Sequence, residues 1–232
     1  MKARYLAIGY IIVSLFVLAG CSTYKSGITR GEQYAKMYES KPLVFLIMPP
    51  INNSTNVEAK DLLYTSISKP LIEKGYYVLS PLLTMEVLKQ ESAYDAELFV
   101  NGSLEKFQKF FGADAVVFTE INRWTKVGFG IETDLHFMIK SAYNNEMLFE
   151  RSCELYLDLS FENKSNSGWG ALFSLVASAV NTALTEHIQA ARMANGYIVH
   201  DIPCGPYDPD YLSDQDVSAE KKDIKVTVKE SY

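Results

Sequence analysis

Two stretches between residues 127 and 161 alternate apolar and polar side chains, and this is the clearest pattern in the chain. Alternation of period two predicts strands with one buried face and one solvated face. Both stretches carry their apolar residues at odd positions, so the strands share an apolar face when they pair antiparallel. The pattern therefore predicts a long antiparallel hairpin at about 127–161. Its apolar positions are Val127, Phe129, Ile131, Leu135, Phe137, Ile139, Phe149, Cys153, Leu155, Leu157, Leu159 and Phe161.

Charge predicts the register of this hairpin. A three-residue loop, 144–146, pairs Lys140 with Glu150, and opposite charges across two strands are favourable. The alternative register sets Asp134 against Glu154, which like-charge repulsion disfavours. We therefore expect Lys140 to lie opposite Glu150.

Upstream of the hairpin, short apolar runs alternate with segments of helical spacing. The predicted strands are 43–48, 76–79 and 115–121. The predicted helices are 57–74, 81–90 and 103–111, with helix-start or helix-stop residues at their ends. This order predicts an α/β (α+β) fold, in which helices pack on a mixed sheet.

Residues 165–185 carry no charged side chain and have mostly small and aliphatic residues. Three interpretations are open: a helix buried against the sheet, a self-association surface, and a membrane span. Gly170, Ser174 and Ser178 lie at four-residue spacing, which lets two backbones approach closely, so they are the candidate oligomer interface. Asn166 and Asn181 disfavour a span.

The first twenty residues form a targeting segment. Lys2 and Arg4 precede a charge-free apolar run, which is the layout of a secretory signal and is short for a permanent span. The run ends in Leu18-Ala19-Gly20-Cys21, which resembles the bacterial lipobox. The resemblance implies cleavage before Cys21 and its acylation with fatty acids such as palmitate. Ser22 replaces the Asp of an inner-membrane retention signal, so we expect the outer membrane, with the protein facing the periplasm.

Cleavage would remove two of the 22 basic residues and leave 20 against 28 acidic ones, a net charge of about −8. A chain this acidic lacks the basic face that nucleic acid binding requires. We expect a signal peptide at 1–20, a polar tether at 21–41, a globular domain at 42–211 and a disordered tail at 212–232.

Cys153 and Cys204 remain after lipidation of Cys21. An oxidising compartment permits a disulfide between them. Spacing alone does not show that their Cα atoms approach within bridging distance, so a disulfide and two free thiols both stay open.

Catalytic motifs are missing from the sequence: there is no G-x-S-x-G elbow, Walker A loop or Rossmann fingerprint. His200-Asp201 with Cys204 lacks a second His or Cys at ligand spacing, so we expect no metal and no cofactor. Glu132, Asp134, Glu150 and Glu154 on the polar side of the hairpin are interpreted as a solvated sheet face rather than as acid/base groups.

Short motifs spread over residues 43–211 resemble an outer-membrane lipoprotein family of unknown function, typified by a meningococcal genome-derived antigen. The matching stretches are 48–54, 70–78, 111–115, 148–150 and 205–207. The chain departs from the family at Asn145, where a Gly is common, and at Phe149, which replaces a Trp. The resemblance implies a fold similar to the amino-terminal domain of TolB, and a partner among other envelope lipoproteins, such as a curli-secretion-like lipoprotein.

These observations predict a non-enzymatic, lipid-anchored binding or scaffold subunit of a cell-envelope complex for transport, secretion or assembly, with a homo-oligomer as a further expectation. The alternative is a pore or secretion-channel component that inserts the amphipathic hairpin 127–161 into a membrane. Ordinary sheet packing explains the same alternation and is the favoured interpretation.

Overall fold

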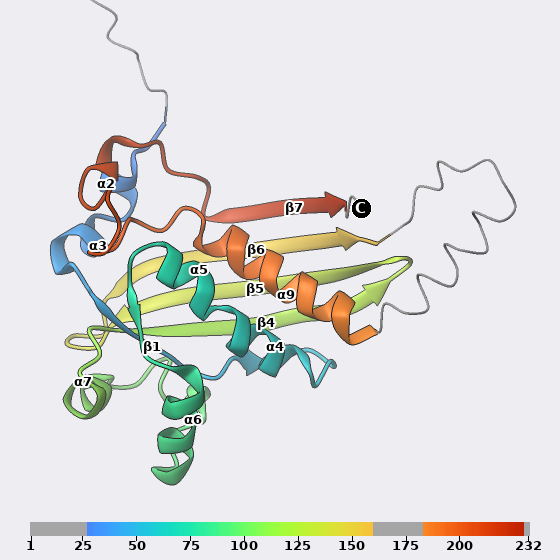
Figure 1. Ribbon diagram of the computed structural model, residues 1–232, viewed down its shortest axis with the longest axis horizontal. Coiled ribbons are helices and arrows are strands. Elements are labelled where there is room, and N and C mark those ends of the chain that lie inside the picture. Colours follow the sequence, from blue (N-terminus) through green and yellow to red (C-terminus); the bar gives the residue numbers. More distant parts are fainter. Residues whose placement is uncertain (1–26, 160–182, 230–232) are drawn as a thin grey trace, which may run out of the picture.

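A single mixed sheet organises the computed structural model, which describes residues 27–159 and 183–229 (Figure 1). The strand order is β3-β1-β4-β5-β6-β7, and β2 pairs with β4 off this path. The strands are β1 (Val44–Ile47), β2 (Ile51–Asn52), β3 (Tyr77–Val78), β4 (Ala115–Val127), β5 (Gly130–Ser141), β6 (Met147–Asp158) and β7 (Asp223–Lys229). The pairs are antiparallel through β4, β5 and β6 and parallel elsewhere. The predicted α/β fold with a mixed sheet is confirmed.

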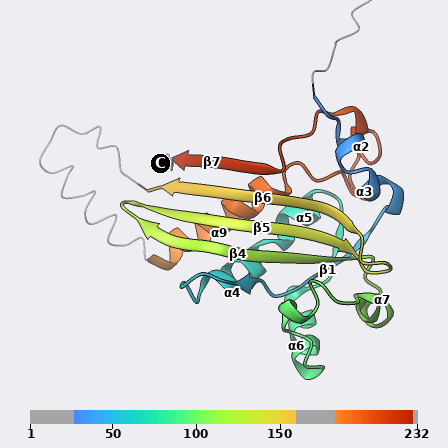
Figure 2. The ribbon, with the colours of Figure 1, turned by 180° about the vertical axis from the view of Figure 1, so that it is seen from behind.

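Helices pack on both sides of this sheet. α4 (Ala59–Ser66), α5 (Ser68–Glu73) and α9 (Ala183–Val199) cover one face (Figure 1). Among the described residues, the other face is covered only at one end, by α6 (Pro81–Gln90), the 3₁₀ turn η1 (Ala96–Leu98) and α7 (Glu105–Phe111) (Figure 2). α2 (Arg30–Gln33), α3 (Ala35–Ser40) and the 3₁₀ turn η2 (Asp214–Asp216) lie near the start of β7.

The described residues form two hydrophobic cores in this arrangement. Phe45 and Ile47 of β1 point into the core beneath α4, α5 and α9, whereas Leu46 and Met48 point into the core beneath α6 and α7. A strand buried on both faces must be apolar at every position, which explains the continuous apolar run at 43–48.

The predicted hairpin is confirmed as β5 and β6, but its first strand begins later than expected. Val127 ends β4, Gly128 turns the chain with φ of +59°, and Phe129 lies in the turn with 78% of its surface exposed. Val127 and Phe129 are therefore not part of the buried face. The alternation simply runs on from one strand, through a two-residue turn, into the next.

The predicted register is wrong. Lys140 lies opposite Met147, and Glu150 lies opposite Met138. Asp134 faces Glu154, the arrangement that repulsion between the two carboxylates was expected to disfavour. The apolar faces are unchanged, because the two registers differ by an even number of residues.

Cations on the flanking strands explain why the two carboxylates tolerate each other. Arg123 of β4 lies opposite Asp134, and Lys225 of β7 lies opposite Glu154. Arg123 Nη2 is 4.0 Å from a carboxylate oxygen of each acid, and Lys225 Nζ is 2.8 Å from Glu154 Oε2. The four residues form one row across four strands, with a cation at each end.

The expected tether at 21–41 is wrong from residue 29 onward. Thr29 and Glu32 form a reciprocal capping box that starts α2. Tyr34, Met37 and Tyr38 then bury their side chains in the core beneath α9. Three large side chains on one side of a short helical segment remove too much apolar surface from water for that segment to act as a free spacer.

The expected disordered tail at 212–232 is also wrong over its described part. Ile224, Val226 and Val228 alternate with polar residues in β7, which pairs with β6. Before β7, Ser218 forms an isolated antiparallel bridge with Thr29, the residue that caps α2. The C-terminal segment therefore completes the sheet and holds the N-terminal helices.

Candidate functional site

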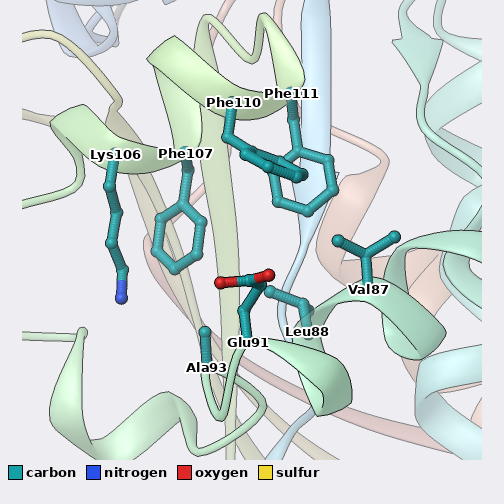
Figure 3. A pocket seen from close by; sticks show the side chains of 8 residues that line it. All are labelled: Val87, Leu88, Glu91, Ala93, Lys106, Phe107, Phe110 and Phe111. Carbon is teal, nitrogen blue, oxygen red and sulfur yellow. The ribbon is translucent and has the colours of Figure 1, made fainter.

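An apolar pocket opens between α6 and α7, at the end of the sheet that these helices cover (Figure 3). Its volume is about 160 Å³. The lining residues are Val87, Leu88, Glu91, Ala93, Lys106, Phe107, Phe110 and Phe111.

The local sequence builds this pocket from two short helices. Pro81 occupies the first turn of α6, where its missing N–H is not needed. α7 ends at Gly112 in the left-handed conformation, with φ of +66°. Phe107 and Phe111 are four residues apart and therefore lie on one side of α7. Phe107 is buried, whereas Phe110 remains 64% exposed beside the pocket.

Charge at the pocket is balanced. Glu91 and Lys106 supply one charge of each sign to the lining, and both come from the ends of their helices. Lys106 Nζ lies 3.8 Å from the centre of the Phe99 ring, an attractive contact between a cation and the face of an aromatic ring. The pocket therefore suits an uncharged apolar group better than an ion.

Further apolar side chains are exposed on the same helix pair. Leu82 and Leu83 of α6 are 73% and 67% exposed. We refer to Leu82, Leu83, Phe110 and the pocket as the α6–α7 surface. Leu83 precedes the pocket residue Val87 by four positions on α6, so these two side chains lie on one side of that helix. Apolar surface in contact with water can mark a site where a protein or another apolar partner binds.

The opposite end of the same sheet face has no covering helix among the described residues (Figure 2). Charged side chains gather there. His136 lies between two acids, with Nδ1 3.6 Å from Glu120 Oε2 and Nε2 3.1 Å from Glu150 Oε1. The hydrogen bond and charge of Lys225 lower the pKa of Glu154. The candidate acid/base residues Glu132, Asp134, Glu150 and Glu154 thus lie on one face, where each has a basic side chain within 4.0 Å.

His200, Asp201 and Cys204 are neighbours in the chain but do not converge on a common point. Asp201 is fully buried and accepts hydrogen bonds from Arg30 Nε at 3.0 Å, Tyr34 Oη at 2.8 Å and the Glu220 amide at 2.8 Å. His200 is exposed and pairs with Glu220. Over residues 27–159 and 183–229, no group of three His, Cys, Asp or Glu side chains is placed to hold a metal ion.

The buried ion pairs around Asp201 have a structural role. Arg30 also lies 3.4 Å from Asp214, and Tyr34 has its pKa raised by burial and by its hydrogen bond to Asp201. Fully buried Arg151 of β6 pairs with Glu220. These contacts tie α2 to the segments at 200–220 and to the sheet, and sequence spacing gave no signal for them.

Cys153 and Cys204 are both free thiols in the structure. Burial raises the pKa of the Cys153 thiol to about 11 and that of the Cys204 thiol to about 12. Both thiols are therefore protonated at neutral pH, and a protonated thiol is a poor nucleophile.

Two stretches that carried the family resemblance meet in space. The Gly205 amide donates to the Lys74 carbonyl at 2.7 Å, and the Tyr207 amide donates to the Gly75 carbonyl at 3.0 Å. Tyr76 Oη donates to the Pro203 carbonyl at 2.7 Å. A Cβ on Gly75 would lie 2.4 Å from the Asp208 nitrogen, so this close approach of two backbones requires glycine.

The remaining candidate residues lie outside the described part of the chain. These are the lipidation residue Cys21 and the candidate oligomer interface Gly170, Ser174 and Ser178. Across 27–159 and 183–229, no helix is both long enough and apolar enough to cross a membrane.

The apolar face of the β5–β6 hairpin is buried in the larger core. Ile131, Leu135, Phe137 and Ile139 are fully buried there, together with Ala190, Ala194 and Ile198 of α9. Insertion of the hairpin into a membrane would require this core to open, so the burial favours sheet packing over a pore.

Comparisons with known proteins agree with the expected resemblance. A family model described as "Putative lipoprotein GNA1162-like" matches residues 32–199. "Putative lipoprotein NMB1124/NMB1162" of Neisseria meningitidis serogroup B is 28% identical over 180 residues, which covers 75% of this chain and 81% of that protein. The crystal structure of lipoprotein GNA1162 from N. meningitidis is 28% identical with a TM-score of 0.46, and it covers 62% of this chain and 100% of that chain. A PelC dodecamer from Paraburkholderia phytofirmans is 12% identical with a TM-score of 0.37, and the match covers 69% of this chain and 87% of the PelC chain. The family match spans most of the globular part, and the chain belongs to the GNA1162-like lipoprotein family.

Proposed function

We propose that this chain is a non-enzymatic binding or scaffold subunit of a cell-envelope complex, anchored in the outer membrane through lipid on Cys21 and facing the periplasm. The α6–α7 surface is the contact site for its protein partner. The family membership, the lipobox at 18–21 and the exposed apolar side chains of α6 and α7 support this proposal.

The lipid anchor has a direct test. Each buried methylene of an acyl chain contributes about 0.8 kcal/mol, and stable anchoring takes more than one chain. Cys21→Ser should therefore move the chain from the membrane fraction to the soluble fraction, and globomycin should cause a larger precursor to accumulate. Cys204→Ser is the matched control and should stay with the membrane. A Cys21→Ser chain that remains in the outer membrane would contradict the anchor.

The exposed Phe110 beside a preformed pocket is the observation that carries the binding role. An apolar cavity of about 150 Å³ accommodates a benzene molecule. The pocket of about 160 Å³ therefore suits one aromatic or branched aliphatic side chain. Burying Phe110, Leu82 and Leu83 under a partner would contribute about 1.5 to 3 kcal/mol for each side chain that becomes fully covered.

The partner expected from the family resemblance is another envelope lipoprotein, of the curli-secretion-like class. The likeness to the TolB amino-terminal domain, and a homo-oligomer through Gly170, Ser174 and Ser178, stay predictions. The partner should place an apolar side chain in the pocket, at the centre of its interface with the α6–α7 surface. A few well-packed side chains near the centre supply most of the binding energy in protein interfaces.

Photocrosslinking in intact cells tests the surface. A photoreactive residue at Phe110 or Leu83 should give a discrete adduct with a second protein. The same residue at Thr125, an exposed position on the charged face of the sheet, should not. Adducts of equal yield at all three positions, or an adduct at Thr125 alone, would contradict the assignment.

A pair of substitutions on α7 separates binding from folding. Phe110→Gln should abolish co-purification of the crosslinked partner while the melting temperature stays unchanged, because Phe110 is largely exposed. Lys109→Gln places the same side chain on the neighbouring exposed position and should leave co-purification intact.

A further inference from the structure

β7 is the edge strand of the sheet. It pairs with β6 on one side, and no strand pairs with its other side among the described residues (Figure 1). The Ser152 amide donates to the Lys222 carbonyl, so the even-numbered residues of this segment direct their backbone groups toward β6. In a parallel pair, alternate residues bond the neighbouring strand. Asp223, Lys225, Thr227 and Lys229 therefore direct their amides and carbonyls outward.

We infer that β7 pairs with β7 of a second copy of this chain. The two strands run antiparallel about a two-fold axis at Val226, which joins two sheets into one continuous sheet. The strand lies outside residues 32–199, the part that the family model matches. It is also at the opposite edge of the sheet from α6, so both surfaces can bind at once (Figure 1).

Charge and strand overlap together select this register. Two antiparallel strands form hydrogen-bonded pairs between residues whose backbone groups point outward, so odd-numbered residues must face odd-numbered residues. Full overlap places Asp223 opposite Lys229 and Lys225 opposite Thr227. Sliding one strand by two residues along the other gives the two nearest alternative registers. One places Lys225 opposite Lys225 of the other copy, and the other places Lys225 opposite Lys229. Like charges directly opposite each other are unfavourable, and of these three registers the fully overlapped one alone avoids them. Registers shifted by a further two residues pair only three residues of each strand.

The apolar side of β7 supports the same pairing. Ile224, Val226 and Val228 are half-buried, and Ile224 and Val228 already pack against the larger core. In the fully overlapped register Ile224 lies opposite Val228, and Val226 lies opposite its own copy. All three therefore lose exposed surface in the pair, and the two larger cores become continuous. Lysines on an edge strand usually prevent pairing. Here they disfavour the two neighbouring registers and leave the fully overlapped one free of repulsion.

Cysteine crosslinking of the full-length chain in intact cells tests the register. Residues of a non-hydrogen-bonded antiparallel pair have Cα atoms about 4.5 Å apart, within disulfide range. Val226→Cys should therefore give a disulfide-linked dimer on a non-reducing gel. Ile224→Cys faces Val228 of the other copy and should give little dimer. The unsubstituted chain, with Cys153 and Cys204 present, sets the background.

Two further variants link the crosslink to strand pairing. Thr227→Pro removes an outward amide without removing a bond to β6, and proline is tolerated at edge positions of this kind. In the Val226→Cys chain it should abolish the dimer, whereas Thr227→Ala should not. Lys229→Asp places like charges opposite each other twice in each dimer and should weaken association about two- to fivefold for each pair, and Asp223→Lys added to it should restore the dimer.

The outcomes separate clearly, with the melting temperature of each variant as the check on folding. A folded Val226→Cys chain that gives no dimer above background overturns the proposal. So does equal dimer yield at Ile224→Cys and Val226→Cys, which would indicate random collision of mobile strands.

Discussion

The indole N–H of Trp124 donates a hydrogen bond of 2.8 Å to Nδ1 of His187, which joins β4 to the first turns of α9. An indole nitrogen can only donate, so Nδ1 must accept and the imidazole is neutral, with its proton on Nε2. Burial lowers the pKa of His187; Glu58 and Glu186 oppose this shift, and Lys126 adds to it.

Acidification should break this contact. Because the folded-state pKa of His187 lies below the ordinary value of 6.5, the unfolded chain binds the proton more readily, and stability falls as the pH drops from about 6.5 through the folded-state pKa. A Trp169→Phe background leaves Trp124 as the single indole. Its fluorescence should change over the same pH interval in the folded state.

His187→Gln is the matched control, since it removes the titrating group. Its indole emission and melting temperature should stay flat between about pH 7 and pH 5, apart from the changes common to both chains. Identical pH profiles for the two chains would contradict the role of His187.

Gly75 and Gly112 both have positive φ, of 83° and 66°, but differ in their surroundings. A Cβ on Gly112 meets nothing within 4 Å, so Gly112→Ala should cost about 1 to 2 kcal/mol from the left-handed backbone alone. Gly75→Ala should cost about 1 to 3 kcal/mol more, because its Cβ collides with the backbone at Asp208. Urea unfolding of both variants measures the difference, and equal losses would show that the 203–211 segment is not held tightly at Gly75.

Arg30 forms a buried ion pair with Asp201, and removal of one partner leaves the other charge uncompensated. Arg30→Met should therefore cost about 3 to 5 kcal/mol of unfolding free energy. It should also raise hydrogen exchange in α2 and in the 214–220 segment. Lys69→Met removes an exposed pair with Glu73 and should cost less than about 0.5 kcal/mol. Similar losses in the two variants would contradict the structural role of Arg30.

Arg123 holds the row of charges across β4 to β7, and it is partly exposed. Arg123→Ala should cost roughly 0.5 to 1 kcal/mol after solvent screening. The loss should shrink in an Asp134→Asn background, because Asp134 then no longer repels Glu154. A double-mutant cycle by urea unfolding measures this coupling, and strictly additive losses would show that the row is not a unit.

Alternation located β5 and β6 because both strands have one face in the core. The register failed because it was judged on two strands alone, whereas Arg123 and Lys225 act from the strands on either side. A charged side chain on a sheet interacts with residues on both neighbouring strands. The sequence of a hairpin does not show which strands lie on either side of it. The same period-two signal was present at Ile224, Val226 and Val228, and it would have predicted β7.

The sequence also contained a signal for the N-terminal helices, but the many polar residues around it favoured a tether. Thr29 and Glu32 have capping-box spacing, and Tyr34, Met37 and Tyr38 follow at helical intervals. By contrast, Trp124 with His187 and Arg30 with Asp201 join residues 63 and 171 positions apart. Contacts of this kind follow from the packing of the sheet, and no local spacing encodes them.

The pairing of Arg30 with Asp201 also sets an order of events during synthesis. A chain emerges from the ribosome at about 5 to 20 residues per second, so the carboxylates that hold α2 appear on the order of ten seconds after Arg30 does. Throughout that interval α2 lacks the buried ion pairs that fix it to the body of the protein. The first helix in the sequence is therefore among the last elements to be fixed, because it waits for carboxylates that are synthesised near the end of the chain.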